Sequence, residues 1–129
     1  MNKEHPNVTI LKRFNPANPN TATDLLTEDF VWHYINPELS EFEGDYFGLS
    51  GLTDFFKKLA DRTSGSFKVN PMAIAPIGDE LVITHVKDTM VLEGKPMEID
   101  AIVLWCIMDG KIREAWDIPI LRTAKVIES

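Results

Sequence analysis

The chain has 129 residues, of which 44% are hydrophobic and 26% charged, and this suits one domain, residues 1–129, with its own core. Its 13 lysine and arginine residues stand against 20 aspartate and glutamate residues, a formal net charge of −7. Such a charge repels phosphate backbones, which excludes nucleic acid as a partner. The first residues lack the apolar stretch of a signal peptide, and no run approaches the roughly 20 apolar residues that span a bilayer. We therefore expect a soluble protein with no membrane partner.

The only cysteine, Cys106, lies in an apolar run and is interpreted as a small core residue. A single cysteine cannot form an internal disulfide, which fits the reducing cytoplasm. Neither His5 nor His85 lies near a second ligand at metal-binding spacing, and the chain has no Gly-rich phosphate loop. We predict no metal and no cofactor.

The first third of the chain is expected to be helical but interrupted. Pro6 can open a helix that must end before Pro16, and a second short helix is predicted over residues 21–26. The aromatic and β-branched residues 30–35 are typical of a strand. Residues 38–48 are interpreted as an acidic loop.

The strongest helix signal covers residues 50–63, where apolar residues repeat at three- and four-residue spacing. Ser50 is the expected N-terminal cap and Gly65 the expected stop. Four extended runs follow, joined by Gly-containing tight turns, and they are residues 67–77, 81–92, 96–108 and 111–121. Helices followed by an antiparallel meander predict an α+β fold.

The Glu93-Gly94 turn sets the register of the two longest strands. As a two-residue loop it pairs Leu92 with Lys95 and, by counting back, Asp88 with Ile99. One face, which we interpret as a pocket wall, then holds Thr84, Val86, Asp88, Met90, Ile99, Ala101, Val103 and Trp105. The opposite face places Lys87 against Asp100, which suits an exposed or interfacial surface.

Asp117 is a lone carboxylate in the apolar, aromatic last strand. A charge there is costly to desolvate, so it either faces solvent or is held for chemistry. The Asp109-Gly110 turn leaves the two alternatives open. A two-residue loop puts Asp117 opposite Ile102 on the outer face, whereas a bulge at Gly110 puts it opposite Ala101 on the pocket face.

Three segments carry a family resemblance, and they read LTEDFVWH (residues 26–33), GLSGL before a Phe-Phe helix (48–52) and MDGKIREAWD (108–117). In order and spacing, over nearly the whole chain, they resemble the SnoaL-like polyketide cyclase and ketosteroid isomerase branch of the nuclear transport factor 2-like superfamily. The resemblance implies a cone, in which a strongly curved antiparallel sheet wraps around the N-terminal helices. It also implies an apolar pocket at the open end and a homodimer through the outer sheet face.

The resemblance also implies roles for single residues. In SnoaL-like cyclases the aspartate matching Asp117 moves a proton on the substrate, which favours the bulged register. Ketosteroid isomerases carry their general base at the position of Tyr34 and a neutral acid at that of Val103, and both groups are missing here. The related limonene-epoxide hydrolases need an arginine between two aspartates, and residues 97–105 contain none. Neither of those mechanisms is therefore expected.

The candidate catalytic residues are Asp117, Asp88 and His33. In an apolar pocket the carboxyl pKa of Asp117 would rise toward the range useful for acid/base work, whereas in solvent it would pair with Arg113. Asp88 could share acid and base roles with it, or lie in water at a strand end. His33 and Tyr34 point to opposite faces, and the resemblance puts Tyr34 inward. His33 would be the proton shuttle if the register slipped by one residue.

The candidate ligand-binding residues share aromatic or apolar side chains on the expected inner face, and they are Trp32, Tyr34, Met90, Ala101, Val103 and Trp105. We expect a small hydrophobic ligand and, in one interpretation, proton transfer in a cyclisation or isomerisation through Asp117. In the other interpretation the chain is a non-catalytic ligand-binding or dimerisation module of the same fold. A third and weaker interpretation is a protein-interaction adaptor.

Overall fold

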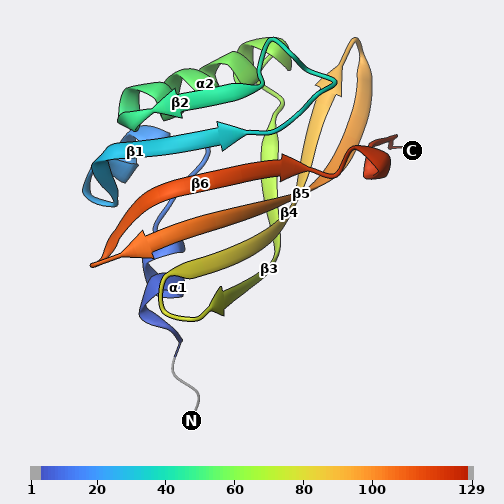
Figure 1. Ribbon diagram of the computed structural model, residues 1–129. Helices are drawn as coiled ribbons and strands as arrows, with labels where there is room; N and C mark the ends of the chain where they lie inside the picture. The colour runs from blue at the N-terminus through green and yellow to red at the C-terminus, as the bar shows by residue number, and fades with distance from the viewer. Residues whose placement is uncertain (1–3, 128–129) are drawn as a thin grey trace.

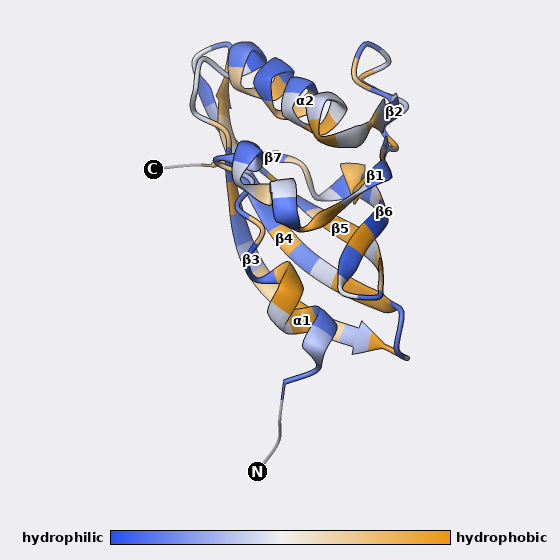
Figure 2. Cartoon of the chain, turned by 90° about the vertical axis from the view of Figure 1, so that its left-hand side faces the viewer, coloured by the Kyte–Doolittle hydropathy of each residue, from blue (hydrophilic) through white to orange (hydrophobic). Residues whose placement is uncertain are grey.

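Strands from most of the chain form one curved sheet, and the helices lie on its concave side (Figures 1 and 2). The structure, a computed structural model, describes residues 4–127. Its helices and strands, with η for the short 3-10 helices, are α1 (Pro6–Leu11), η1 (Pro19–Asp24), β1 (Leu26–Tyr34), β2 (Gly44–Phe47), α2 (Gly48–Arg62), β3 (Lys68–Ile77), β4 (Leu81–Leu92), β5 (Lys95–Met108), β6 (Lys111–Pro119), η2 (Leu121–Thr123) and β7 (Lys125–Val126).

The strand order is β2-β1-β6-β5-β4-β3, and β7 pairs with β5. β1 and β6 run parallel, while the other neighbouring pairs are antiparallel. α2 packs against β1 and β2, and α1 packs against β3 and β4. Both views place α1 and α2 at opposite ends of the molecule, with the concave side of the sheet between them (Figures 1 and 2). The predicted α+β fold with a curved sheet is confirmed.

The first helix begins at Pro6 as predicted. Proline has no backbone N–H, and it is tolerated there because the N–H groups of the first turn have no partner within the helix. His5 caps it by accepting a hydrogen bond from the Asn7 N–H at 3.1 Å. The predicted helix over residues 21–26 is wrong in kind and place, since a 3-10 helix spans Pro19–Asp24 and strand β1 already starts at Leu26. Part of the predicted acidic loop forms the edge strand β2, which pairs with β1.

The long helix α2 begins at Gly48, two residues before its predicted start, and Ser50 is not its cap. Gly48 has a φ of +68°, a conformation that turns the chain from β2 directly into the helix. A Cβ added at Gly51 would lie 2.9 Å from the Tyr46 backbone, so this glycine permits close packing of α2 on β2. The helix ends at Arg62, one residue before its predicted end, and the predicted stop Gly65 follows in the turn beyond it with a φ of +79°. No helix within residues 4–127 is long and apolar enough to cross a membrane.

The predicted register of β4 and β5 is confirmed. Leu92 pairs with Lys95, and Asp88 pairs with Ile99. Glu93 and Gly94 have φ values of +52° and +79°, as a two-residue hairpin loop with a left-handed backbone requires. The face of Asp88 therefore follows directly from the turn sequence.

The hairpin between β5 and β6 follows neither of the two predicted registers. Its loop has two residues, because Met108 pairs with Lys111, but Arg113 is then an extra residue between paired positions of β6. This bulge moves every later side chain of β6 to the other face, and Asp117 pairs with Val103. Both predicted partners of Asp117, Ile102 and Ala101, are therefore wrong. Of the two predicted faces, Asp117 lies on the concave one, which is the predicted pocket face.

Candidate functional site

Two cavities open on the concave side of the sheet, and they share the lining residues Phe67, Asp88 and Asp117. The first has a volume of about 380 Å³ and lies between α1, the loop that follows it, α2 and strands β3 to β5. The second has a volume of about 230 Å³ and lies between the end of β1, strands β4 and β5 and the η2 turn. Because they share these residues, the cavities adjoin at the two carboxyl groups.

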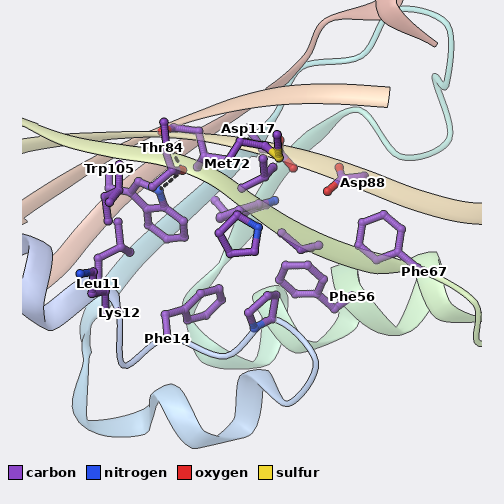
Figure 3. Close-up of a pocket in the computed structure, with 18 residues that line it drawn as sticks. Leu11, Lys12, Phe14, Phe56, Phe67, Met72, Thr84, Asp88, Trp105 and Asp117 are labelled. Atoms are coloured by element: carbon purple, nitrogen blue, oxygen red, sulfur yellow. Dashed lines mark hydrogen bonds between the residues drawn. The ribbon is translucent and has the colours of Figure 1, made fainter. Parts of the chain in front are cut away.

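The walls of the first cavity are mostly apolar and include a cluster of aromatic rings. Trp32 lies at the centre of the cluster, with its ring centroid 5.5 Å from that of Trp105 and 5.8 Å from that of Phe56. Phe14, from the loop after α1, packs edge-on against Trp105 at 5.4 Å. Such offset and edge-on contacts fix the rings, so the cavity is a preformed apolar slot (Figure 3).

Asp117 is held in this apolar setting by strand β6. The residue is only 8% exposed, and its neighbours along the strand on the same face are Ala115 and Pro119. Burial raises the carboxyl pKa of Asp117 well above its ordinary value, and the charge of Asp88 raises it further. The alternative in which Asp117 meets Arg113 in solvent is wrong, because the Arg113 guanidinium instead bonds Met108 Sδ at 3.3 Å.

Asp88 enters the same space from strand β4, opposite Val69 of β3 and Ile99 of β5. Its Oδ1 atom is buried and has no hydrogen-bond partner among residues 4–127. Burial raises the pKa of Asp88 to about 7, with a smaller contribution from the charge of Asp100. Figure 3 shows the carboxyl groups of Asp88 and Asp117 close together at one end of the first cavity.

Burial raises the pKa of both carboxyl groups, that of Asp88 to about 7, and the charge of Asp88 adds to the upward shift of the Asp117 pKa. Two neighbouring carboxyl groups with raised pKa values can hold protons at pH values where exposed aspartates are ionised.

Tyr34 places a hydroxyl group in the second cavity, next to this pair. It lies opposite Asp117 across the parallel strands β1 and β6. Its hydroxyl oxygen accepts a hydrogen bond from Asn36 Nδ2 at 3.0 Å, and the Asn36 side chain is oriented in turn by the Glu38 N–H at 3.1 Å. Burial raises the Tyr34 pKa far above its ordinary value despite this bond, and the nearby carboxylates Asp117 and Asp88 add to the shift. The group therefore stays a neutral O–H donor.

The two tryptophans of the first cavity differ in how their indole N–H groups are satisfied. Trp105 Nε1 donates to Thr84 Oγ1 at 3.1 Å, the bond dashed in Figure 3, and Thr84 donates on to the Val103 carbonyl at 3.3 Å. Trp32 Nε1 is buried and has no partner in the described part of the chain. A buried N–H group without a partner is costly, so Trp32 differs from Trp105 in having an unused donor.

His33 is the one candidate catalytic residue that the structure does not bring to the cavities, because alternation along β1 turns it to the opposite face from Tyr34. Its Nδ1 lies 2.6 Å from Asp45 Oδ1 and its Nε2 lies 2.5 Å from Glu114 Oε2. Its ring stacks on Trp116 with centroids 5.4 Å apart. Burial lowers the His33 pKa, but the bonds to Glu114 and Asp45 outweigh it, and the net shift is upward.

The remaining candidates divide between the cavities. Val103 and Trp105 line the first cavity with Trp32, and Met90 lines the second with Tyr34. Ala101 lines neither, because it is fully buried within the sheet. Sequence reasoning missed Asn36, although a polar residue at a strand end before proline is a usable signal for such a side chain. In residues 4–127, no three His, Cys, Asp or Glu side chains gather as metal ligands would.

A family model matches most of the chain. The SnoaL-like domain family matches residues 9–115, so the chain belongs to this family. The matched region ends two residues before Asp117. No curated protein matches the chain.

Solved structures at low sequence identity share the fold. Bal32a, from a soil-derived mobile gene cassette, superposes with a TM-score of 0.81 at 22% identity over 95% of both chains. TerC, co-crystallised with polyporic acid, gives 0.76 at 18% identity over 91% of this chain and 93% of its own. A protein from Jannaschia sp. CCS1 named as a SnoaL-like polyketide cyclase gives 0.74 at 13% identity over 95% of this chain and 92% of its own. These likenesses concern the fold alone.

Proposed function

We propose that this protein binds a small, flat, hydrophobic carbonyl compound in the adjoining cavities and moves a proton on it, as in a cyclisation or an isomerisation. The observation that carries the proposal is the position of Asp88 and Asp117 at the junction of two apolar cavities. Two relatives support it by what their names state, since one is crystallised with polyporic acid and another is named as a polyketide cyclase.

In the proposed reaction Asp88 is the base and Asp117 is the acid. The Asp88 carboxylate takes a proton from the carbon next to a carbonyl group, and the C–H electron pair becomes the new C=C bond. The carbonyl π electrons move to oxygen, which takes the proton of the neutral Asp117 carboxyl group. In a substrate with a C=C bond next to that carbon, the enol is a dienol. Its O–H proton returns to Asp117, the carbonyl group re-forms, and the far carbon of the former C=C bond takes the Asp88 proton, so the double bond is shifted and both carboxyl groups are restored.

The surroundings suit each role. Burial raises the pKa of Asp117 and so favours the protonated form, which donates to the oxygen on which negative charge develops. A base with a pKa of about 7 is matched to catalysis near neutral pH. The aromatic walls hold a flat ring in one plane, which fixes the reacting carbon relative to the carboxylate.

Exchange of carbon-bound hydrogen for deuterium tests the proposal without knowledge of the natural substrate. Deoxybenzoin, with a CH₂ group between a phenyl ring and a benzoyl group, is incubated in D₂O, and loss of the CH₂ signal is followed by proton NMR. We expect the wild type to accelerate exchange, and Asp88→Asn to lower the rate by about 10² to 10⁴-fold. Asp54→Asn, the same change at an exposed residue of α2, is the matched control. Equal rates for wild type, Asp88→Asn and buffer would contradict the proposal.

We also propose a homodimer through the outer face of β5 and β6. Two apolar pairs lie side by side there, Ile102 with Ile118 and Leu104 with Trp116. Ile118 is 39% exposed in the monomer. A second copy placed by a two-fold axis would cover these side chains with their own equivalents. Light scattering should give a dimer mass for the wild type and a monomer mass for Ile118→Lys, and a monomeric wild type would contradict the dimer.

A further inference from the structure

We infer that the natural ligand has two apolar arms, one in each cavity, joined by a short neutral carbonyl-bearing centre that lies between Asp88 and Asp117. The inference names the ligand class for the proposed binding site and rests on that proposal. It does not require turnover, because it concerns only the shape and polarity of the molecule that binds.

The first reason is how the two cavities are joined. Among residues 4–127, only Phe67, Asp88 and Asp117 line both cavities. The first extends from this junction toward α1 and Phe14, and the second extends toward Leu39 and the η2 turn. A ligand that fills only one cavity would leave the other as empty apolar space beside the carboxyl groups.

The second reason is size. Ligand cavities usually have volumes of about 300–1,000 Å³. The first cavity, at about 380 Å³, reaches the lower end of this range, whereas the second, at about 230 Å³, does not reach it. The second cavity is therefore better explained as room for one arm of a larger ligand than as a separate site.

The third reason is the difference between the linings. Five aromatic residues line the first cavity, among them Trp32, Phe56 and Trp105, and they suit a flat aromatic arm. Only Tyr34 and Phe67 are aromatic in the second, where Met90, Met97 and other aliphatic groups adapt to a smaller ring or a branched chain. The two arms need not be identical.

The polar groups define the centre. The neutral Asp117 carboxyl group is a hydrogen-bond donor and calls for an acceptor such as a carbonyl oxygen. Tyr34 provides a second neutral donor on the side of the second cavity. A carboxylate or phosphate at this place would meet the charge of Asp88, so a neutral ketone fits better than an acid.

Two matched ketones distinguish a site that binds one apolar arm from a site that binds two. Deoxybenzoin carries phenyl groups on both sides of its CH₂–C=O centre, and propiophenone has a methyl group in place of one phenyl. Isothermal titration calorimetry of the wild type should show deoxybenzoin binding at least tenfold more tightly than propiophenone. Equal affinities, or binding of neither ketone, would overturn the inference.

Variants that fill the second cavity locate the second arm. Ala124 is exposed and lines only that cavity, so Ala124→Trp places a ring in its mouth without disturbing the core. We expect it to weaken deoxybenzoin binding about tenfold and to leave propiophenone within about twofold of wild type. Met97→Trp fills the same cavity from β5 and should act alike. The control is Ala75→Trp, an exposed alanine of β3 that lines neither cavity.

The outcomes separate this inference from proton transfer. If the filling variants lower the affinity for both ketones equally, or for neither, two-arm binding is wrong whatever the exchange rates are. If the two-arm pattern is found but the wild type does not accelerate deuterium exchange, the ligand class stands and the proposed reaction fails. If exchange is accelerated while both ketones bind equally, the reaction stands and the ligand class fails.

Discussion

Asp88 and Asp117 lie on β4 and β6, the two strands that flank β5, and both line both cavities. Their partners on β5 are Ile99 and Val103, four residues apart and so on the same face of that strand. Burial is the main cause of the raised pKa of both groups, and the charge of Asp88 adds to the shift of Asp117 while that of Asp100 adds to the shift of Asp88. In the proposed reaction Asp88 is the base and Asp117 the acid.

The pH dependence of deuterium exchange should be bell-shaped. The rate constant at low substrate concentration needs Asp88 ionised and Asp117 protonated, so it should rise through a pKa of about 7 and fall at higher pH as Asp117 ionises. Asp117→Asn should lower the rate and remove the falling limb, because the amide cannot ionise. A rising limb centred near pH 4, where ordinary aspartates titrate, would contradict the assignment.

Asp88→Asn should make the protein more stable at alkaline pH. The pKa of Asp88 is about 7 in the folded state and 3.8 in the unfolded state. Between these two pH values the folded state holds a proton on Asp88 that the unfolded state has lost. Its stability falls as pH rises through this window, by up to about 4 kcal/mol in total. Thermal melts should show the variant above wild type at about pH 8, with the gap closing toward about pH 4. A pH-independent gap would argue against a raised pKa.

Trp32→Phe and Trp105→Phe should have different consequences although both residues line the first cavity. Trp105→Phe removes the bond to Thr84 and should reduce the free energy of unfolding by about 1 kcal/mol. Both changes also remove ring atoms from a buried site, but Trp32→Phe breaks no hydrogen bond within residues 4–127, so stability should fall less than in Trp105→Phe. Trp32→Phe should also weaken ketone binding about fivefold to tenfold, because the indole ring lines the first cavity. Calorimetry and thermal melts on both variants measure this, and a stability loss confined to Trp32→Phe would contradict it.

His33→Gln should alter stability and not exchange. The pKa of His33 is raised above 6.5, so its stabilising charge is fully present below about pH 6.5 and is lost as pH rises through the folded-state value. The variant should melt below wild type at about pH 6, with a smaller difference at about pH 9. Deuterium exchange should match wild type, because the ring bonds Asp45 and Glu114 on the outer face. A large fall in the exchange rate of this variant would mean that His33 takes part in the reaction after all.

Much of the sheet was predictable from turn chemistry. Glu93-Gly94 forms the two-residue loop that its sequence indicates, and this loop fixes the face of Asp88. Asp109-Gly110 also forms a two-residue loop, which was one of the two alternatives that its sequence left open. Period-two alternation also separates His33 from Tyr34 correctly. These features are local, so a single sequence carries them.

The features that sequence reasoning missed depend on long-range packing. The extra residue at Arg113 leaves no signature, since nothing in its neighbours marks a bulge inside a strand, yet it decides the face of Asp117. The edge strand β2 forms where acidic residues suggested a loop, because β1 provides its partner. Phe14 and Phe67 reach the cavities from connecting segments, which no periodicity places.

A carboxyl-carbon NMR titration of aspartate-labelled protein, assigned with Asp88→Asn and Asp117→Asn, tests the central claim most directly. We expect the Asp88 signal to titrate with a midpoint of about 7 while Asp117 still holds its proton. In Asp88→Asn, the midpoint of Asp117 should fall, because the neighbouring charge is gone. If both carboxyl groups titrate near pH 4, as exposed aspartates do, the pair cannot divide acid and base roles in the way proposed here.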